Sequence, residues 1–224
     1  MGLARYCDSM REFKDFPSKD QFDKGAKSFE SNEPRDAMYK VATFLINYYW
    51  DKRDIHNITN ALSVLLLTWN QAFYRYGFFD ENDLEESIKN NFDLLKKLRT
   101  EELAVNEENT KIISDLFNDF LGSLEIVKTP NGKAAKIRKS PVAVAKALHL
   151  LAPRFFPLWD YEIANKYMCR YGQNSVSAYI KFCKLSEKMV DLAKSWGYKE
   201  ENDKSVLKLI DEYNYAHYTK RWDR

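Results

Sequence analysis

The chain has 224 residues, of which 45% are hydrophobic and 30% charged, so it can bury a core that offsets the entropy of ordering, and this excludes a disordered chain. Its 7 glycines and 6 prolines are too few for a sandwich or barrel of many short strands, which needs frequent turn residues. A formal net charge of +2 does not by itself indicate an acidic partner.

The N-terminal half shows helical periodicity in several segments. Asn32-Glu33-Pro34 is typical of a helix start, and the apolar stripe of an amphipathic helix follows it: Ala37, Val41, Phe44, Leu45 and Tyr48. A long apolar helix is predicted from about Asn57 to Arg75, with Gly77 where a left-handed C-cap is preferred, and we place it centrally. After an Asp80 or Asn82 cap, two further stripes predict helices through Leu84, Ile88, Phe92 and Leu95 and through Ile112, Leu116, Phe117, Phe120, Leu121 and Leu124.

The periodicity stops at residues 127–139. Thr129-Pro130-Asn131-Gly132 is a turn signal that fits a small hairpin tip, and this segment is the best candidate for a hinge. Helices then restart at Ser140-Pro141, at an Asp160 cap and at a Ser175 cap, with ends near Ala152, Gly172 and Gly197, and a last helix covers about Asp203 to Tyr218. We therefore predict an all-α fold, a single compact helical domain over residues 1–224 with about eight to ten helices. Its possible lobes are residues 30–126 and 140–218, joined by the basic segment 127–139.

Several classes of protein and site are not expected. The longest unbroken apolar run, Val64 to Leu67, is far shorter than the ~20 residues that span a bilayer, so we expect no membrane helix. The N-terminal residues lack the apolar centre of a secretory signal, which favours a cytoplasmic protein. Cys7, Cys169 and Cys183 have no short paired spacing and the three histidines are scattered, so we expect reduced thiols, no metal site and no cofactor.

One segment departs from the balanced charge of the whole chain. Between Ile126 and Trp159 there is no Asp or Glu, although the chain has 33, and the window holds these basic residues: Lys128, Lys133, Lys136, Arg138, Lys139, Lys146 and Arg154. Clustered basic side chains gain affinity for a phosphate backbone by releasing counterions, whereas the alternative is ordinary decoration of a solvated loop. The position before a helix start favours duplex DNA as the partner, with the following contacts: Lys133, Lys136, Arg138, Lys139 and Ser140.

The stretch from Ser140 to Gly172 gives a helix rich in small residues, a proline-bounded connection and a helix opened by an acidic residue. It reads SPVAVAKALHLLAPRFFPLWDYEIANKYMCRYG, in which the small residues are alanines, the acid is Asp160 and the ending is Arg170-Tyr171-Gly172. This pattern resembles the catalytic core of the helix-hairpin-helix DNA glycosylase (HhH-GPD) superfamily. The resemblance implies a two-lobed helical fold and a DNA repair hydrolase that cleaves the N-glycosidic bond of a damaged or mismatched base, with Asp160 as its catalytic carboxylate.

Chemistry explains why a carboxylate would lie at this place. Breaking the bond between a base and deoxyribose builds positive charge on the sugar, and a fixed carboxylate stabilises that charge and orients the attacking water. Phe156, Leu158 and Trp159 would wall the site and strengthen this effect by lowering the local dielectric constant. The alternative for Asp160 is a plain helix N-cap, which stabilises by about 1 kcal/mol and does not exclude catalysis.

Upstream, the apolar helix ends in Thr68-Trp69-Asn70-Gln71. In the resembled superfamily an apolar helix ends in amides, and Gln or Asn fills the gap that an everted base leaves in the duplex. Trp69, Asn70 and Gln71, together with Trp159, are therefore the predicted base pocket or wedge. The alternative is a buried helix that ends in a polar turn.

The chain departs from the superfamily in the hairpin. The glycine-containing turn that approaches phosphate is replaced by Ile137-Arg138-Lys139-Ser140-Pro141, so phosphate contacts would come from side chains. Bifunctional members carry a Schiff-base lysine at the positions of Ser140 to Val142. Because Lys139 is displaced and Lys146 is expected to be an ordinary exposed residue, we expect no lyase step.

Three functions remain open from the sequence. The first is a monofunctional DNA glycosylase, and the second is a non-catalytic nucleic-acid-binding module that has lost the hairpin glycines. The third is a helical protein-interaction domain whose basic loop meets an acidic protein partner.

Overall fold

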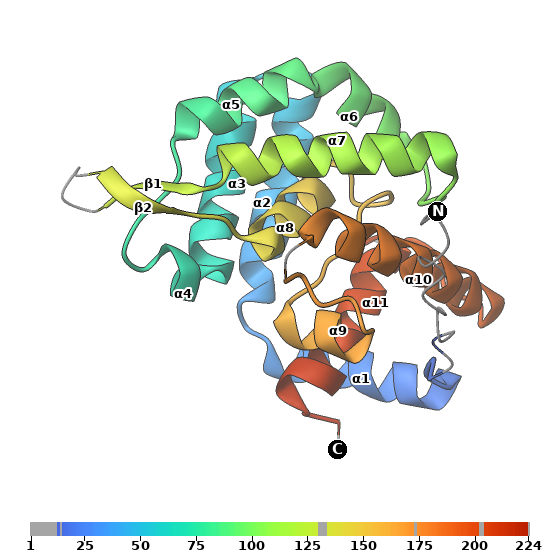
Figure 1. The fold of residues 1–224 in the computed structure, drawn as a ribbon. Coiled ribbons are helices and arrows are strands. Elements are labelled where there is room, and N and C mark those ends of the chain that lie inside the picture. The colour runs from blue at the N-terminus through green and yellow to red at the C-terminus, as the bar shows by residue number, and fades with distance from the viewer. Residues whose placement is uncertain (1–12, 14, 130–133, 173, 202–203, 224) are drawn as a thin grey trace, which may run out of the picture.

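The computed structural model describes residues 13, 15–129, 134–172, 174–201 and 204–223, with the backbone alone at 134–137. The fold is all-α, as predicted, with 69% helix and 4% strand (Figure 1). The helices of the described chain are α1 (Lys19–Asn32), α2 (Asp36–Trp50), α3 (Ile55–Trp69), α4 (Gln71–Tyr74), α5 (Glu81–Asn90), α6 (Phe92–Thr100), α7 (Glu107–Ser123), α8 (Pro141–Leu151), α9 (Tyr161–Lys166), α10 (Ser175–Ser195), α11 (Val206–Asn214) and the π-helix η1 (Tyr215–Lys220).

Helix α1 is an element that the periodicity does not predict. Ser18 and Gln21 form a capping box at its start, in which each side chain accepts a hydrogen bond from the backbone N–H of the other residue. One face of the helix, including Phe29, is buried against the C-terminal part of the chain. Gly25 is required on this face, because a Cβ there would lie 2.6 Å from the Tyr213 ring of α11.

Helix α2 occupies a predicted helical segment, but its most apolar stripe is not its buried face. Val41, Phe44 and Tyr48 are 56%, 67% and 55% exposed. The buried face is instead made of Asp36, Tyr39, Ala42, Thr43, Ile46 and Trp50. It packs against α3 and α8, so the contacts of the helix rather than its apolar content determine which face is interior.

Helix α3 is central and largely buried, as predicted, and Asp54 caps its start by accepting a hydrogen bond from the Asn57 amide. It ends at Trp69, before the predicted Arg75, and α4 follows. Gly77 is not a left-handed cap, because its φ is not positive. It allows close packing instead, since a Cβ at Gly77 would overlap the side chain of Ile126.

The predicted helix through Leu84 and Leu95 is two helices. Asp80 caps α5 by accepting from the Asn82 amide, and the chain turns at Asn91 into α6. Helix α7 begins at an Asn106 cap and contains the next predicted stripe except Leu124, which is its C-cap residue.

The segment predicted as a possible hinge contains an antiparallel hairpin. Strand β1 (Ile126–Lys128) pairs with β2 (Ala134–Arg138), and the backbone of Phe78 forms a further bridge to Lys128. Of the predicted turn Thr129-Pro130-Asn131-Gly132, which falls between the two strands in sequence, residues 130–132 lie outside the described part of the chain. In Figure 1 the hairpin projects from the helical body, next to α4.

Helix α8 lies in the centre of the fold (Figure 1). Ser140 caps it by accepting a hydrogen bond from the Ala143 amide, and Pro141 is its first residue, as predicted. The alanines of its sequence are fully buried, and their small size lets α2, α3 and α7 approach closely. One contiguous apolar core runs from α2–α7 past α8 to α9–α11.

The last helices largely follow the predicted order. Asp160 caps α9, but this helix ends at Lys166, before the predicted Gly172, because Met168 takes a left-handed conformation with φ 54°. Asn174, not Ser175, caps α10. Helix α11 begins at Val206 after a Ser205 cap and passes directly into η1, so the two form the predicted last helix from Val206 onward, and Asp203 lies outside the described residues. No helix of the described chain is both long enough and apolar enough to cross a membrane.

Candidate functional site

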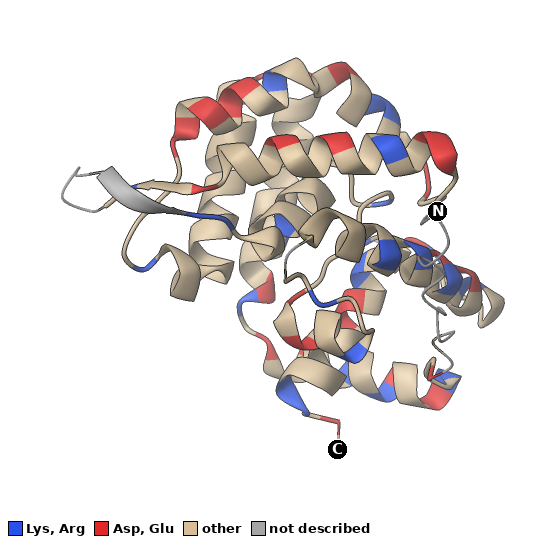
Figure 2. Ribbon diagram, viewed as in Figure 1, with Lys and Arg blue, Asp and Glu red and all other residues tan. Residues whose placement is uncertain are grey.

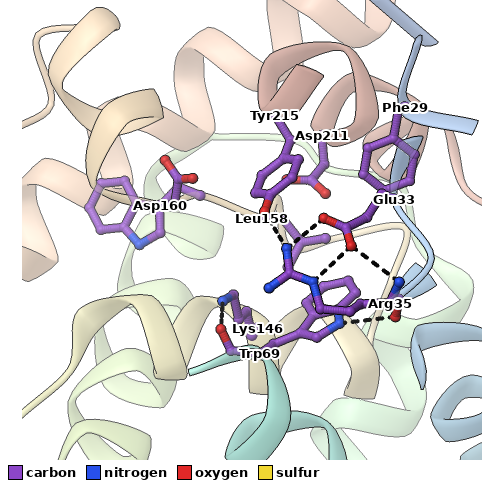
Figure 3. A pocket seen from close by; sticks show the side chains of 10 residues that line it. Phe29, Glu33, Arg35, Trp69, Lys146, Leu158, Asp160, Asp211 and Tyr215 are labelled. Carbon is purple, nitrogen blue, oxygen red and sulfur yellow. Dashed lines mark hydrogen bonds and ion pairs between the residues drawn. The ribbon is translucent and has the colours of Figure 1, made fainter. Parts of the chain in front are cut away.

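A pocket opens where the N- and C-terminal helices meet α8 (Figure 3). It combines a junction between α1 and α2, the end of α3, the middle of α8, the segment before α9 and the passage from α11 to η1. The side chains that line it are Phe29, Glu33, Arg35, Trp69, Lys146, Leu158, Trp159, Asp160, Asp211 and Tyr215. Five are charged and four are aromatic, a combination that suits a flat, polar-edged ligand.

Asp160 lies in this pocket and also caps α9, so both roles considered from the sequence meet in one side chain. Its Oδ1 accepts a hydrogen bond from the backbone of Ile163 at 2.8 Å. Its Oδ2 accepts one from the hydroxyl of Thr219 at 2.6 Å. Thr219 belongs to η1, and π-helical turns often occur at functional sites. The two bonds fix the orientation of the carboxylate.

Arg35 and Glu33 form the opposite end of the pocket from Asp160 in Figure 3. The Arg35 guanidinium donates from Nε and Nη2 to the two oxygens of Glu33, at 2.7 and 2.6 Å. Nη2 also donates to the Tyr215 hydroxyl at 2.8 Å, and the Arg35 carbonyl accepts from the indole N–H of Trp69. This bidentate pair joins the junction of α1 and α2 to α3 and η1.

Lys146 directs its ammonium into the pocket, which corrects the expectation of an ordinary exposed residue. Its Nζ donates to Asn70 Oδ1 at 2.6 Å and to the backbone carbonyl of Trp69 at 3.2 Å. Burial lowers the pKa of Lys146 to about 8, against the opposing effect of Asp160 and Asp211. An amine with this pKa is partly neutral near physiological pH, which a surface lysine is not.

Asp211 is a second buried carboxyl in the pocket. Burial raises its pKa to about 7, and the negative charges of Asp160 and Glu212 act in the same direction, whereas Lys208 opposes the rise. A carboxyl with this pKa exchanges its proton near neutral pH. In this respect Asp211 differs from Asp160, whose two carboxylate oxygens both accept hydrogen bonds.

A buried charge cluster lies behind Asp211. The Nζ of Lys208, a fully buried residue, lies 3.0 Å from Glu212 Oε1, 3.2 Å from Asp36 Oδ1 and 3.9 Å from Asp211 Oδ2. Burial opposes its charge, but the surrounding carboxylates outweigh this effect and raise the pKa of Lys208. Lys208 lies closer to Glu212 and Asp36 than to Asp211, although Lys204 and Lys40 also pair with those two carboxylates, so it compensates the charge of Asp211 only in part.

The predicted base pocket or wedge residues fall in different places. Trp69 lines the pocket, and Trp159 touches it with a ring that is otherwise buried and donates to the Pro141 carbonyl. Asn70 does not line the pocket, and its side-chain oxygen accepts a hydrogen bond from Lys146. Gln71 is exposed at the start of α4 and does not line the pocket.

The sequence window suggested that no acidic residue opposes the basic stretch, but the fold brings acidic side chains from other segments next to it. Lys128 pairs with Asp80, Lys139 lies 3.5 Å from Glu125, and Arg154 pairs with two glutamates. Figure 2 shows acidic residues of α5 on the side of the molecule from which the hairpin projects.

The other predicted phosphate contacts have different environments. Arg138 is exposed and lies with its guanidinium 5.4 Å from the Phe73 ring, whereas Ser140 is buried and caps α8. Lys133 and the side chain of Lys136 lie outside the described residues.

Several pocket residues are not found by sequence reasoning. Glu33 and Arg35 follow the end of α1. The capping box at Ser18 and Gln21 is a sequence signal for the start of this helix, but it does not show that Glu33 and Arg35 line a pocket. Lys146, Asp211 and Tyr215 carry no local motif, because their burial and proximity arise from tertiary packing alone.

No cluster of three or more His, Cys, Asp or Glu side chains arranged to hold a metal ion is found in the part of the chain that the structure describes. No protein-family model matches this chain, and neither a curated protein nor a solved structure matches it. The residues of the pocket are therefore the basis for a functional proposal.

Proposed function

We propose that this protein hydrolyses the N-glycosidic bond between a base and deoxyribose in duplex DNA, with Asp160 as the catalytic carboxylate. The observation that carries the proposal is that Asp160, Lys146 and Trp69 line one pocket although they come from distant segments of the chain. Pockets with aromatic walls and groups of strongly shifted pKa are often active sites. The resemblance of residues 140–172 to the HhH-GPD superfamily supports the same activity.

In the proposed reaction the nucleoside leaves the base stack and enters the pocket, where the rings of Trp69 and Tyr215 contact the base. As the bond between C1′ and the base nitrogen lengthens, positive charge grows on the sugar and the Asp160 carboxylate stabilises it. The hydrogen bonds from Ile163 and Thr219 hold that carboxylate in place, so it need not reorient during the reaction. Water then adds to C1′, giving a free base and an abasic site.

The proposed DNA contacts are the hairpin and the residues that lead into α8. Arg138 is exposed there, and the ion pairs of Lys128 and Lys139 can be exchanged for contacts to phosphate. Binding should weaken steeply with salt, and reversing Lys136, Arg138 and Lys139 to glutamate should abolish it. Phosphate affinity would then come from side chains rather than from a glycine turn.

The test is base release from duplex oligonucleotides that each carry uracil, hypoxanthine, an alkylated base or an oxidised base. Wild-type protein should convert at least one of them to abasic product. Asp160→Asn should lower the single-turnover rate by roughly 100- to 1,000-fold, because it removes the charge that stabilises the transition state. Activity that survives this substitution would contradict the role of Asp160.

The same experiment separates the other two functions. Salt-dependent DNA binding without abasic product from any substrate would support the non-catalytic nucleic-acid-binding module. If the protein does not bind DNA at low salt, a protein-interaction domain is the function that remains. The exposed apolar side chains of α2, including Val41 and Phe44, are the observation that favours this last function.

The position of Lys146 favours a second step after base release. An amine with a pKa of about 8 is neutral in roughly a quarter of molecules near pH 7.5 and can add to the C1′ aldehyde of ring-opened abasic deoxyribose. Loss of water gives an imine, and β-elimination then breaks the bond to the 3′ phosphate.

Sodium borohydride, which reduces an imine to a stable amine, should therefore trap a covalent complex of protein and abasic DNA. The yield should rise with pH through about 8, as the amine of Lys146 loses its proton. Lys146→Met should abolish the complex, and the matched control Lys96→Met, at an exposed lysine of α6 outside the pocket, should not. Equal yields from the Lys146 variant and the wild type would contradict this step.

A further inference from the structure

Asp211 is the pocket carboxyl that the proposed mechanism leaves without a role. It is 9% exposed and projects into the pocket from α11, on the opposite side from Lys146 in Figure 3. Among the described residues no hydrogen-bond donor is recorded for it, and its salt-bridge partner Lys208 is 3.9 Å away and engaged more closely by other carboxylates. A buried carboxyl in this position is available to a ligand.

The surroundings of Asp211 let part of the molecules keep a proton on this carboxyl near neutral pH. Burial is the largest cause, and it raises the pKa of Asp211 to about 7. The charged and titratable groups around it are Lys208 and Glu212 on α11, Asp160 before α9, Lys146 on α8, Glu33 and Arg35 between α1 and α2, Asp36 at the start of α2, and the hydroxyl of Tyr215 on η1. The pocket thus pairs a carboxyl that can donate a proton with Asp160, whose two oxygens both accept hydrogen bonds.

We propose that Asp211 is the general acid of this pocket and donates its proton to a ring nitrogen of the leaving base, which makes a neutral purine the substrate class. The inference rests on the base-release activity proposed above. A neutral purine has a ring nitrogen with a free lone pair, and protonation there lets the base depart uncharged. Uracil has no such nitrogen, because its second ring nitrogen carries hydrogen.

The atoms and electrons of the step balance. The bond from C1′ to N9 breaks, and its electron pair goes to the base. The proton of Asp211 goes to N7, so the base leaves as a neutral molecule. Water adds its hydroxyl group to C1′ beside Asp160, and the remaining proton returns to the Asp211 carboxylate.

The test compares two leaving groups in duplex oligonucleotides, hypoxanthine and 7-methylguanine. Hypoxanthine needs protonation to leave as a neutral base, whereas 7-methylguanine already carries a positive charge. Asp211→Asn should lower the single-turnover rate on hypoxanthine by roughly 100-fold or more and change the rate on 7-methylguanine by less than about 3-fold. Asp160→Asn should lower both rates.

The pH dependence of the rate distinguishes a catalytic role of Asp211 from a merely structural one. With hypoxanthine the wild-type rate should fall about tenfold per pH unit above about 7, as Asp211 loses its proton, and Asp211→Asn should show no such fall.

Thermal unfolding checks the fold of the variant. Because the pKa of Asp211 is higher in the folded than in the unfolded chain, the wild type should lose stability relative to Asp211→Asn as pH rises from about 4 to about 7.

Each outcome has one meaning. Equal loss on both substrates, or no loss on hypoxanthine, would overturn the role of Asp211 and leave base release intact. Wild-type release of 7-methylguanine without hypoxanthine would overturn the substrate class alone. A wild-type protein that releases no base from any oligonucleotide would overturn the proposed function itself, and the inference with it.

Discussion

At the scale of single residues, His149 shows how a buried polar side chain holds two walls of the pocket in place. Its Nδ1–H donates to the Phe156 carbonyl at 2.7 Å, so its Nε2 accepts from the Tyr39 hydroxyl at 3.0 Å. Tyr39 stacks on Trp69 with ring centroids 5.7 Å apart. Burial lowers the pKa of His149 to about 3, although the hydrogen bond to Phe156 opposes the change, so the ring is neutral. A neutral imidazole therefore connects α8 to α2 and to the pocket.

This pKa predicts a stability change in acid. Because the folded pKa of about 3 lies below the unfolded value of about 6.5, the contribution of the neutral ring is present above pH 6.5 and is lost as pH falls toward 3. His149→Leu should be less stable than wild type at pH 7, and the gap should narrow by on the order of 2–3 kcal/mol at pH 4. Unfolding in urea at both pH values measures this, and a gap independent of pH would contradict it.

At the scale of elements, helix starts could be predicted from the sequence better than helix faces. Ser140, Pro141 and Asp160 all begin helices as predicted, because a cap is a local hydrogen bond between neighbours in the chain. The buried face of α2 could not be predicted, because it depends on the contacts with α3 and α8. The hairpin at 126–138 was recognisable only from its turn residues.

The two faces of α2 give a direct comparison of buried and exposed side chains. Ile46 is fully buried and Phe44 is 67% exposed, although the apolar stripe of the sequence includes Phe44 and omits Ile46. Ile46→Ala should lower the free energy of unfolding by about 2–4 kcal/mol, because it leaves a cavity. Phe44→Ala should lower it by less than about 1 kcal/mol. Denaturant unfolding of the two variants checks this, and a larger loss for Phe44→Ala would reverse the assignment of the faces.

At the scale of the whole molecule, the pocket depends on the folding of nearly the entire chain. Its lining residues run from Phe29 to Tyr215, and Thr219 orients Asp160 from the last helical turn. The sequence points to Asp160, Trp69 and Trp159, because local motifs and a family resemblance reach them. Lys146 and Asp211 could not be predicted, since the shifted pKa of each comes from burial between segments that are distant in sequence.

The single-turnover rate of base release from duplex DNA is the measurement that tests the catalytic role of this pocket most directly. It should be made with wild type, Asp160→Asn and Glu162→Gln. Glu162 is exposed on the first turn of α9, so its variant makes the same charge change outside the pocket. Catalysis by Asp160 predicts a loss of roughly 100-fold or more for Asp160→Asn and an unchanged rate for Glu162→Gln. Equal rates for Asp160→Asn and wild type, or equal losses in the two variants, would contradict it.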